Sequence, residues 1–205
     1  MYRSVYFCVV MTKAERTRHF IVEKAAPLIN RKGMAATSIN DIVEATQLTK
    51  GSVYGNFESK EEICYEAFDY LVKRVGSDMA MAMSRATTNE EKLYALFDYY
   101  LGTLTQENNF GCPLMNFGTE ADDTNPIVKH KVTKAINATE SLIAKVVRAG
   151  IEAGEFQKTF DAESFSIKAF AMIEGGMWMA RIQGNTKQAQ VIFDSLKKEI
   201  KGYCK

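Results

Sequence analysis

Residues 37–63 read TSINDIVEATQLTKGSVYGNFESKEEI, and this short stretch contains three potential helix starts. Ser38, Thr49 and Ser59 are residue types that cap helix N-termini, because their side-chain oxygens accept hydrogen bonds from free backbone amides. Ser38 and Ser59 are each followed three residues later by an acid that can complete a capping box. The pattern predicts helices that begin near residues 39, 50 and 60.

Only Thr46-Gln47-Leu48 connects the first two of these helices, so the helices must cross sharply, which is typical of a helix-turn-helix motif. Helices of about seven residues are marginal in water on their own, so a shared apolar core must hold them. We expect that core to contain Ile21, Ala25, Leu28, Ile29, Ile39, Ile42, Val43, Leu48, Val53 and Phe57.

The apolar periodicity is helical along the rest of the chain and predicts an all-α fold. A helix over residues 14–32 ends before Gly33 and contains Pro27, which is expected to kink it. Further helices are expected at residues 60–85, 89–106, 112–121, 125–153, 161–183 and 187–202. No alternating pattern indicates a strand.

The expected helices group into three segments. Residues 12–63 form an N-terminal three-helix domain, and residues 64–205 form a larger C-terminal helical domain. Residues 1–11 precede the first cap, Thr12, and are interpreted as an extension. Because Thr12 directly follows Met11, we hypothesise that Met11 is the true initiator and that the preceding residues are a mis-annotated start.

Composition excludes several classes of protein. With 46% hydrophobic residues, 25% charged residues and 3 prolines in 205 residues, the chain has the composition of a folded, soluble, helical protein. No apolar run approaches the roughly 20 residues of a membrane span. The 4 cysteines lack metal-ligand or disulfide-framework spacing, so no metal is expected and the reducing cytoplasm is the expected location. The 2 histidines, His19 and His130, belong to no catalytic motif, so neither an enzyme nor a cofactor is expected.

Charge is distributed unevenly along the chain. The net charge is +1, but residues 1–60 contain nine Lys and Arg against five Asp and Glu. An N-terminal excess of positive charge suits a module that faces nucleic acid, although an excess of this size also arises by chance.

The helix that begins after Thr49 has an unusual outward face. If Val53 and Phe57 point inward, the outward and flanking residues are Lys50, Gly51, Ser52, Tyr54, Gly55 and Asn56. A polar helix face is usually just solvated, but two glycines in a short helix cost about 1 kcal/mol each. Their presence indicates a need for close approach. Lysine, hydroxyl groups and the amides at a helix start bind phosphate oxygens, and asparagine can bind a base edge.

These residues resemble the DNA-binding signature of the TetR family of bacterial repressors. The matching positions are Gly33, Thr37-Ser38, Asp41-Ile42, Thr49-Lys50-Gly51-Ser52-Val53-Tyr54, Phe57 and Ser59-Lys60-Glu61-Glu62. The resemblance is strong over residues 13–63 and extends further only in the number and length of helices.

The resemblance implies a ligand-responsive transcriptional repressor that binds a palindromic operator as a homodimer. It implies that the helix from Thr49 enters the major groove, that Tyr54 and Lys60 lie against phosphates, and that Thr37 and Ser38 also reach the DNA backbone. Gln47 stands where the family usually has glycine, and Gly55-Asn56 replaces bulkier residues, so the base preferences of the family do not transfer.

The resemblance also implies that the C-terminal helices form an effector cavity and that the last two helices dimerise. The expected effector is a small apolar or aromatic molecule. Its expected contacts are Phe97, Tyr100, Cys112, Met115, Phe117, Met177 and Trp178. Met and aromatic residues at helical spacing also fill ordinary cores. The apolar residues of the last two helices are Phe165, Ala169, Met172, Ile173, Gly176, Met177, Ile192, Leu196, Ile200 and Tyr203, and they fit either core or interface.

Two alternatives remain open. Cys112 precedes an expected helix, where the pKa of a thiol can be lowered, so it is either a sensor of electrophiles and oxidants or a small buried residue. The whole chain, in turn, is either a repressor or a helical small-molecule-binding or interaction module that has lost specific DNA binding.

Overall fold

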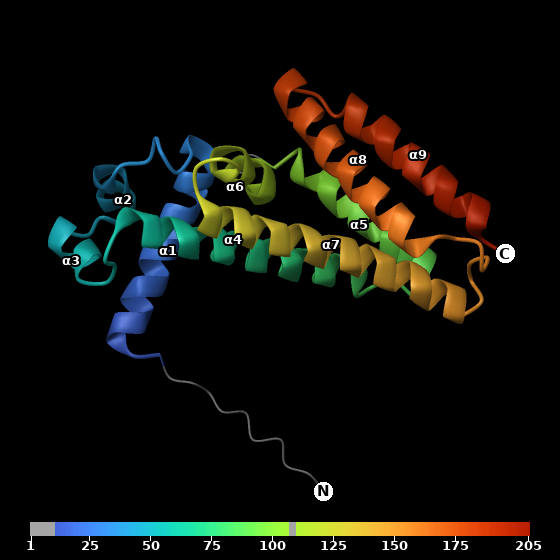
Figure 1. The fold of residues 1–205 in the computed structure, drawn as a ribbon, viewed down its shortest axis with the longest axis horizontal. Helices are drawn as coiled ribbons and strands as arrows, with labels where there is room; N and C mark the ends of the chain where they lie inside the picture. Colours follow the sequence, from blue (N-terminus) through green and yellow to red (C-terminus); the bar gives the residue numbers. More distant parts are fainter. Residues whose placement is uncertain (1–10, 107–109) are drawn as a thin grey trace, which may run out of the picture. The chain divides into compact units, whose positions relative to one another are not determined.

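A computed structural model describes residues 11–106 and 110–205, and within these ranges the chain is built from nine helices (Figure 1). The helices are α1 (Lys13–Lys32), α2 (Ile39–Thr46), α3 (Lys50–Tyr54), α4 (Lys60–Met83), α5 (Asn89–Thr103), α6 (Pro113–Ala121), α7 (Pro126–Glu152), α8 (Ala162–Gln183) and α9 (Lys187–Tyr203). The only extended pairing in the described residues is an isolated bridge between Phe156 and Cys204. The predicted all-α fold is confirmed.

Two compact units make up the chain, and the division falls between Tyr70 and Leu71 within α4. The boundary expected from the sequence, between residues 63 and 64, also falls within α4. Apart from Met11, the expected N-terminal extension lies outside the described residues. None of the described helices is both long and apolar enough to cross a membrane.

The helix starts expected in the N-terminal unit are confirmed, because α2, α3 and α4 begin at residues 39, 50 and 60. Ser38 caps α2 as expected: its hydroxyl accepts a hydrogen bond from the Asp41 amide at 3.2 Å, and the Asp41 carboxylate accepts from the Ser38 amide at 2.7 Å. The cap at Ser59 differs in one detail. The Ser59 hydroxyl accepts from the Glu62 amide, but the Glu62 carboxylate accepts from the amide of Glu58, one residue earlier than a capping box requires.

Burial of apolar side chains explains why such short helices persist in the N-terminal unit. The fully or nearly fully buried members of the expected core are Ile21, Ala25, Ile29, Ile42, Val53 and Phe57. The other expected core residues, Leu28, Ile39, Val43 and Leu48, are only half-buried. Pro27 lies inside α1 as expected.

The C-terminal unit has a larger core, to which α5, α7, α8 and α9 contribute. Phe97 of α5 stacks on Phe193 of α9 with ring centroids 5.9 Å apart. Figure 1 shows α8 and α9 side by side, and their contact is close at Gly176. A Cβ atom at Gly176 would lie 2.9 Å from the Ile192 Cδ1 atom, so glycine permits this packing.

Candidate nucleic-acid interface

The start of α3 is fixed by a side-chain cap and by one buried anchor. The Thr49 hydroxyl accepts a hydrogen bond from the Ser52 amide at 3.1 Å, which satisfies one of the free amides at the helix start. Val53 is completely buried, and Phe57, in the turn that follows, is 3% exposed. The inward side of the helix is therefore held by packing, as the sequence predicts.

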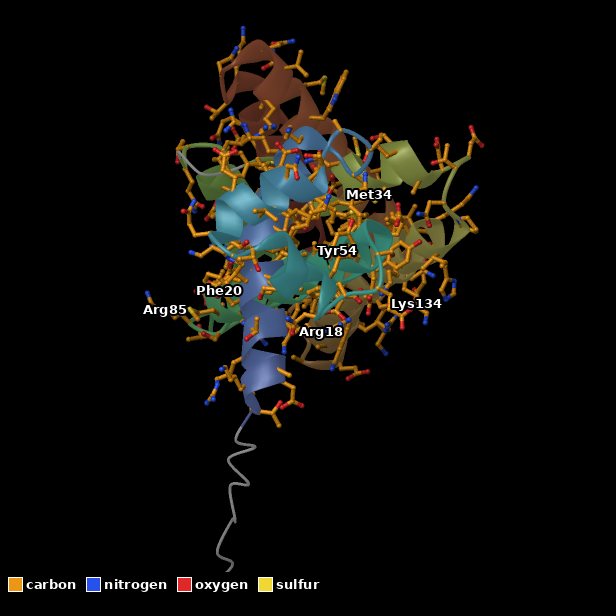
Figure 2. The ribbon with its side chains drawn as sticks, turned by 90° about the vertical axis from the view of Figure 1, so that its left-hand side faces the viewer. Arg18, Phe20, Met34, Tyr54, Arg85 and Lys134 are labelled. Carbon is orange, nitrogen blue, oxygen red and sulfur yellow. The ribbon has the colours of Figure 1, made fainter. Side chains whose placement is uncertain are left out.

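The opposite side of α3 is open to solvent. Thr49, Lys50, Gly51, Tyr54 and Gly55 are exposed, and Ser52 is half-buried. The Tyr54 side chain is 48% exposed although it is large and aromatic. The Lys50 ammonium lies 6.0 Å from the centre of the Tyr54 ring, so these two side chains share one face of the helix. Figure 2 labels Tyr54 on α3.

Gly51 is not required by the packing of the protein itself. A Cβ atom added there would have the Thr49 hydroxyl oxygen, at 4.0 Å, as its nearest neighbour. Gly55 differs, because a Cβ atom would lie 3.2 Å from the Gly51 carbonyl oxygen of the same helix. A glycine that costs helix stability and fills no tight internal space supports close approach to an external partner at Gly51.

Asn56 is partly engaged within the protein. Its side-chain amide donates a hydrogen bond to the Ser52 carbonyl oxygen at 2.8 Å, and its own backbone carbonyl accepts from Arg18. An amide nitrogen has two hydrogens and the side-chain oxygen accepts as well, so Asn56 retains groups that can bind a base edge.

Thr37 and Ser38 have different environments. The Thr37 side chain is buried, with 1% exposure, and its hydroxyl donates to the Gly33 carbonyl oxygen at 2.7 Å. In the chain alone the Thr37 hydroxyl therefore closes the turn after α1, and a contact of Thr37 with the DNA backbone stays a prediction. Ser38 remains exposed.

Lys60 is placed at the start of α4, where its ammonium donates to the Met34 carbonyl oxygen at 3.0 Å. This contact ties α4 to the turn between α1 and α2. An ammonium group has three donors, so one hydrogen bond to Met34 leaves others for a phosphate oxygen.

Arg18 of α1 joins three parts of the N-terminal unit and was not among the site residues expected from the sequence. Its guanidinium donates to the carboxylates of Glu62 and Glu66 in α4 and to the Asn56 carbonyl oxygen after α3; its Nε atom lies 2.9 Å from Glu66 Oε1. It also lies over the Phe57 ring at 4.1 Å from the centroid. The hydrogen bond from Arg18 holds the pKa of the Glu62 carboxyl below its usual value.

A sequence signal for Arg18 exists in retrospect. It lies three residues before Ile21, so it continues the buried stripe of α1 by one turn toward the N-terminus. A charged residue on the inward stripe of a helix indicates an internal ion pair. Figure 2 labels Arg18 beside α1.

The residues expected to contact an effector differ in how far they are buried. Phe97 and Phe117 are buried, and Tyr100 is 8% exposed and donates its hydroxyl to the Met79 sulfur at 3.4 Å. Met115 and Met177 are half-buried, whereas Trp178 is 54% exposed. Phe97 packs in the core through its stack on Phe193.

Cys112 is the N-cap residue of α6, but its side chain does not cap the helix. The thiol instead donates to the Glu174 Oε1 atom at 3.2 Å. Burial, together with the neighbouring Glu174 carboxyl, raises the pKa of the Cys112 thiol well above its ordinary value. The sensor hypothesis rested on a lowered pKa, and the structure gives the opposite direction. The direction of this shift favours the alternative of a small packed residue, although Cys112 is half-buried and not fully buried.

The apolar residues expected at a dimer interface belong mostly to the core of the single chain. Phe165, Ala169, Ile173, Gly176, Leu196 and Ile200 are buried, and Met172, Met177, Ile192 and Tyr203 are half-buried. A different set of large apolar side chains on α8 and α9 is exposed: Ile167 at 57%, Trp178 at 54%, Ile182 at 71% and Val191 at 62%.

The described residues contain no group of three or more His, Cys, Asp or Glu that could hold a metal ion. His19 and His130 are both exposed. His19 contacts the Tyr70 ring edge-on with centroids 5.9 Å apart.

The short helix α3 is anchored by Val53, is exposed on its polar side and follows α2 through a tight turn at Gln47. This arrangement defines a helix-turn-helix DNA-binding protein. Known proteins agree. Residues 21–67 match the family described as bacterial regulatory proteins, tetR family, and residues 90–196 match the tetracyclin repressor-like C-terminal domain. The chain belongs to the TetR family, whose members are transcriptional regulators and typically ligand-responsive repressors.

Solved structures and characterised proteins resemble the chain along most of its length. A TetR-family regulator from Cytophaga hutchinsonii is 35% identical, with a TM-score of 0.89 over 95% of this chain and 98% of that chain. A TetR regulator from Chloroflexus aurantiacus J-10-FL is 32% identical, with the same TM-score and coverage. The HTH-type transcriptional repressor DhaR of Mycobacterium sp. (strain GP1) is 22% identical over 187 residues, which cover 87% of this chain and 91% of that repressor.

Proposed function

We propose that this regulator represses transcription by binding a palindromic operator as a homodimer and that a small-molecule effector releases it. The observation that carries the proposal is the two-sided character of α3. Val53 is buried completely, whereas Lys50, Gly51 and Tyr54 lie exposed beside one another. A helix that is exposed on a polar, glycine-containing face suits insertion into the major groove.

Within this proposal, the contacts divide into two kinds. Lys50, Tyr54 and Lys60 position the protein on phosphates, together with the hydroxyls of Ser38, Thr49 and Ser52. Asn56 is the residue of this region that can bind a base edge, and Gly51 and Gly55 let the α3 backbone approach the groove. Thr37 adjoins Ser38 and stays a proposed contact of the DNA backbone, although its side chain is buried in the chain alone.

Dimerisation is proposed through α8 and α9, on the exposed side of these helices. Ile167, Trp178, Ile182 and Val191 expose apolar surface there that burial against a second copy would stabilise. A two-fold interface presents two recognition helices to two half-sites, which a palindromic operator requires.

Release is proposed to occur by a population shift. An effector bound in the C-terminal unit must prefer the conformation in which the recognition helices no longer match the half-site spacing. A repressor of this kind acts in the compartment that holds the DNA, so the predicted cytoplasmic location belongs to the proposal.

Operator binding by variants tests the proposal. DNA from upstream of the gene is titrated with the full-length protein, and the anisotropy of the labelled fragment is measured over a series of salt concentrations. Tyr54→Phe and Lys60→Ala should weaken binding about equally for all operator sequences, and Lys60→Ala should reduce the salt slope by about one phosphate contact.

Lys145→Ala is the matched control, because Lys145 is an exposed lysine of α7 in the C-terminal unit. It should leave both the affinity and the salt slope unchanged. If the wild-type dimer binds no upstream fragment at low salt, the interaction-module alternative replaces the repressor. A loss for Lys60→Ala that depends on the base sequence contradicts a phosphate contact.

A further inference from the structure

A carboxyl group lies inside the C-terminal unit without a full set of partners. Glu174 is on α8, and its Oε1 atom accepts a hydrogen bond from the Cys112 thiol at 3.2 Å. Its Oε2 atom is buried and meets no hydrogen-bond partner among residues 11–106 and 110–205. A thiol is a weak donor, so even the paired oxygen is poorly compensated.

This arrangement destabilises the folded chain. A buried polar atom without a hydrogen bond costs about 1–3 kcal/mol, and more if the group is charged. Burial accordingly raises the pKa of the Glu174 carboxyl. No basic side chain in the described part of the chain forms an ion pair with Glu174. The unpaired oxygen is thus an acceptor for which the surrounding core provides no donor.

Aromatic side chains lie close to this carboxyl. Burial raises the pKa values of the Tyr100 hydroxyl and the Cys112 thiol well above their ordinary values, and the nearby Glu174 carboxyl adds to both shifts. Tyr99 and Tyr100 pack edge-to-face with ring centroids 5.5 Å apart, and burial raises the pKa of the Tyr99 hydroxyl to about 12. A carboxylate beside tyrosine rings matches an organic cation, because the carboxylate pairs with the charge and the rings contact both the cation and an aromatic body.

We propose that Glu174 is the polar anchor of the effector site and that it accepts a hydrogen bond at Oε2 from a protonated amine carried on an aromatic body. The proposal deepens the proposed function, because it assigns a chemical class to the effector of the same regulator. It also gives the buried carboxyl, which no packing interaction explains, a specific partner. The apolar effector expected from the sequence is thereby given a charged end.

Three molecules of nearly equal shape test the proposal: phenethylamine, phenethyl alcohol and propylbenzene, which differ only in the group at the end of the chain. Binding to the full-length wild-type protein is measured by calorimetric titration. A charge-assisted hydrogen bond predicts that the amine binds about tenfold or more tightly than propylbenzene. Equal binding of the alcohol and the amine overturns the cationic class, and equal binding of all three overturns the anchor.

Variants of the protein then test whether Glu174 causes the preference for the amine. Glu174→Gln keeps the shape of the side chain but removes the negative charge, so the preference for the amine should disappear. Glu152→Gln, at an exposed glutamate of α7, should retain the wild-type preference. An amine preference that survives in Glu174→Gln overturns the proposal.

These measurements contain no DNA, so they are independent of repression. Binding of wild-type protein to the upstream fragment is measured separately without any of the three molecules. Loss of DNA binding with an intact amine preference would remove the proposed function and leave the site. Intact DNA binding with no amine preference would remove the anchor alone. If Glu174→Gln fails to fold, the wild-type series still decides whether the protein prefers the amine, and equal binding of the three molecules overturns the proposal.

Discussion

The side chains proposed to contact DNA project from α3 into solvent, whereas most of the aromatic side chains expected to contact an effector lie within the core of the C-terminal unit. Tyr54 is 48% exposed, but Phe97 is fully buried. A surface that binds DNA, a long polyanion, must not be covered by other parts of the protein. A site for a small molecule is instead surrounded by residues that also stabilise the fold. Substitutions on the exposed face of α3 can therefore reduce function without reducing stability, whereas substitutions of the buried aromatic residues should reduce both.

The largest expected effect is on stability, and it distinguishes Phe97 from Trp178, which the sequence placed together among the expected effector contacts. Phe97→Ala removes a buried ring that stacks on Phe193 and should lower the free energy of unfolding by about 3–5 kcal/mol. Trp178→Ala, at an exposed side chain, should change it far less at protein concentrations where the chain is monomeric. Denaturant unfolding measures both, and similar losses would contradict the distinction.

Arg18→Met should have the second largest effect, a loss of about 2 kcal/mol from the N-terminal unit, because two carboxylates and a carbonyl lose the hydrogen bonds that Arg18 donates. Operator binding should weaken as well. Hydrogen exchange of α3 amides and thermal unfolding report the change. Arg16→Met, at an exposed position of the same helix, is the control for stability. Equal stability of the two variants would show that the Arg18 contacts contribute nothing.

Gly51→Ala should change stability and operator binding in opposite directions. The added Cβ atom meets no close neighbour in the protein, so the variant should be about 0.5 kcal/mol more stable. The same atom lies on the proposed groove-facing side, so operator affinity should fall about tenfold. Gly76→Ala in α4, where a Cβ atom also has open space, should gain stability without losing affinity. Unchanged operator affinity for Gly51→Ala would remove close approach as the reason for this glycine.

Asp41→Asn should have the smallest effect on stability, because the ion pair of Asp41 is at the surface. The Lys32 ammonium, 2.8 Å away, and the Ser38 cap hold the pKa of the Asp41 carboxyl well below its usual range. A group with a lowered folded-state pKa stabilises the fold above its unfolded pKa, about 4, and loses that contribution as the pH falls further. The stability difference between wild type and Asp41→Asn should therefore shrink as the pH falls below about 4. A constant difference in acid would exclude this linkage.

The N-terminal unit could be predicted from the sequence almost residue by residue, because local chemistry determines it. Capping hydroxyls fix the helix starts whatever else the chain does. The details that the sequence did not indicate come from neighbours in space: the Thr37 hydroxyl donates to the Gly33 carbonyl oxygen, and the Glu62 carboxylate accepts from the Glu58 amide. Gln47 adopts φ 57°, the left-handed conformation that the family usually gives to glycine at this position.

The helices of the C-terminal unit could be predicted from the sequence, but the surfaces that cover their apolar faces could not. A stripe such as Phe165, Ala169 and Ile173 indicates burial, but periodicity cannot tell whether the same chain or a second copy covers it. Glu174 could have been singled out, since it is the only charge in the apolar run Met172–Met179. The lack of a partner for its Oε2 atom could not be predicted, because it depends on which side chains of α5 and α6 lie near Glu174.

Arg18 has a mechanical consequence for the recognition helix. One guanidinium connects the Asn56 carbonyl, directly after α3, to carboxylates on two successive turns of α4, and its planar fork permits little rotation. Any rotation or translation of these first turns of α4 must carry the end of α3 with it or break a charged contact. The contacts of Arg18 therefore couple the position of these first turns of α4 to the position of α3.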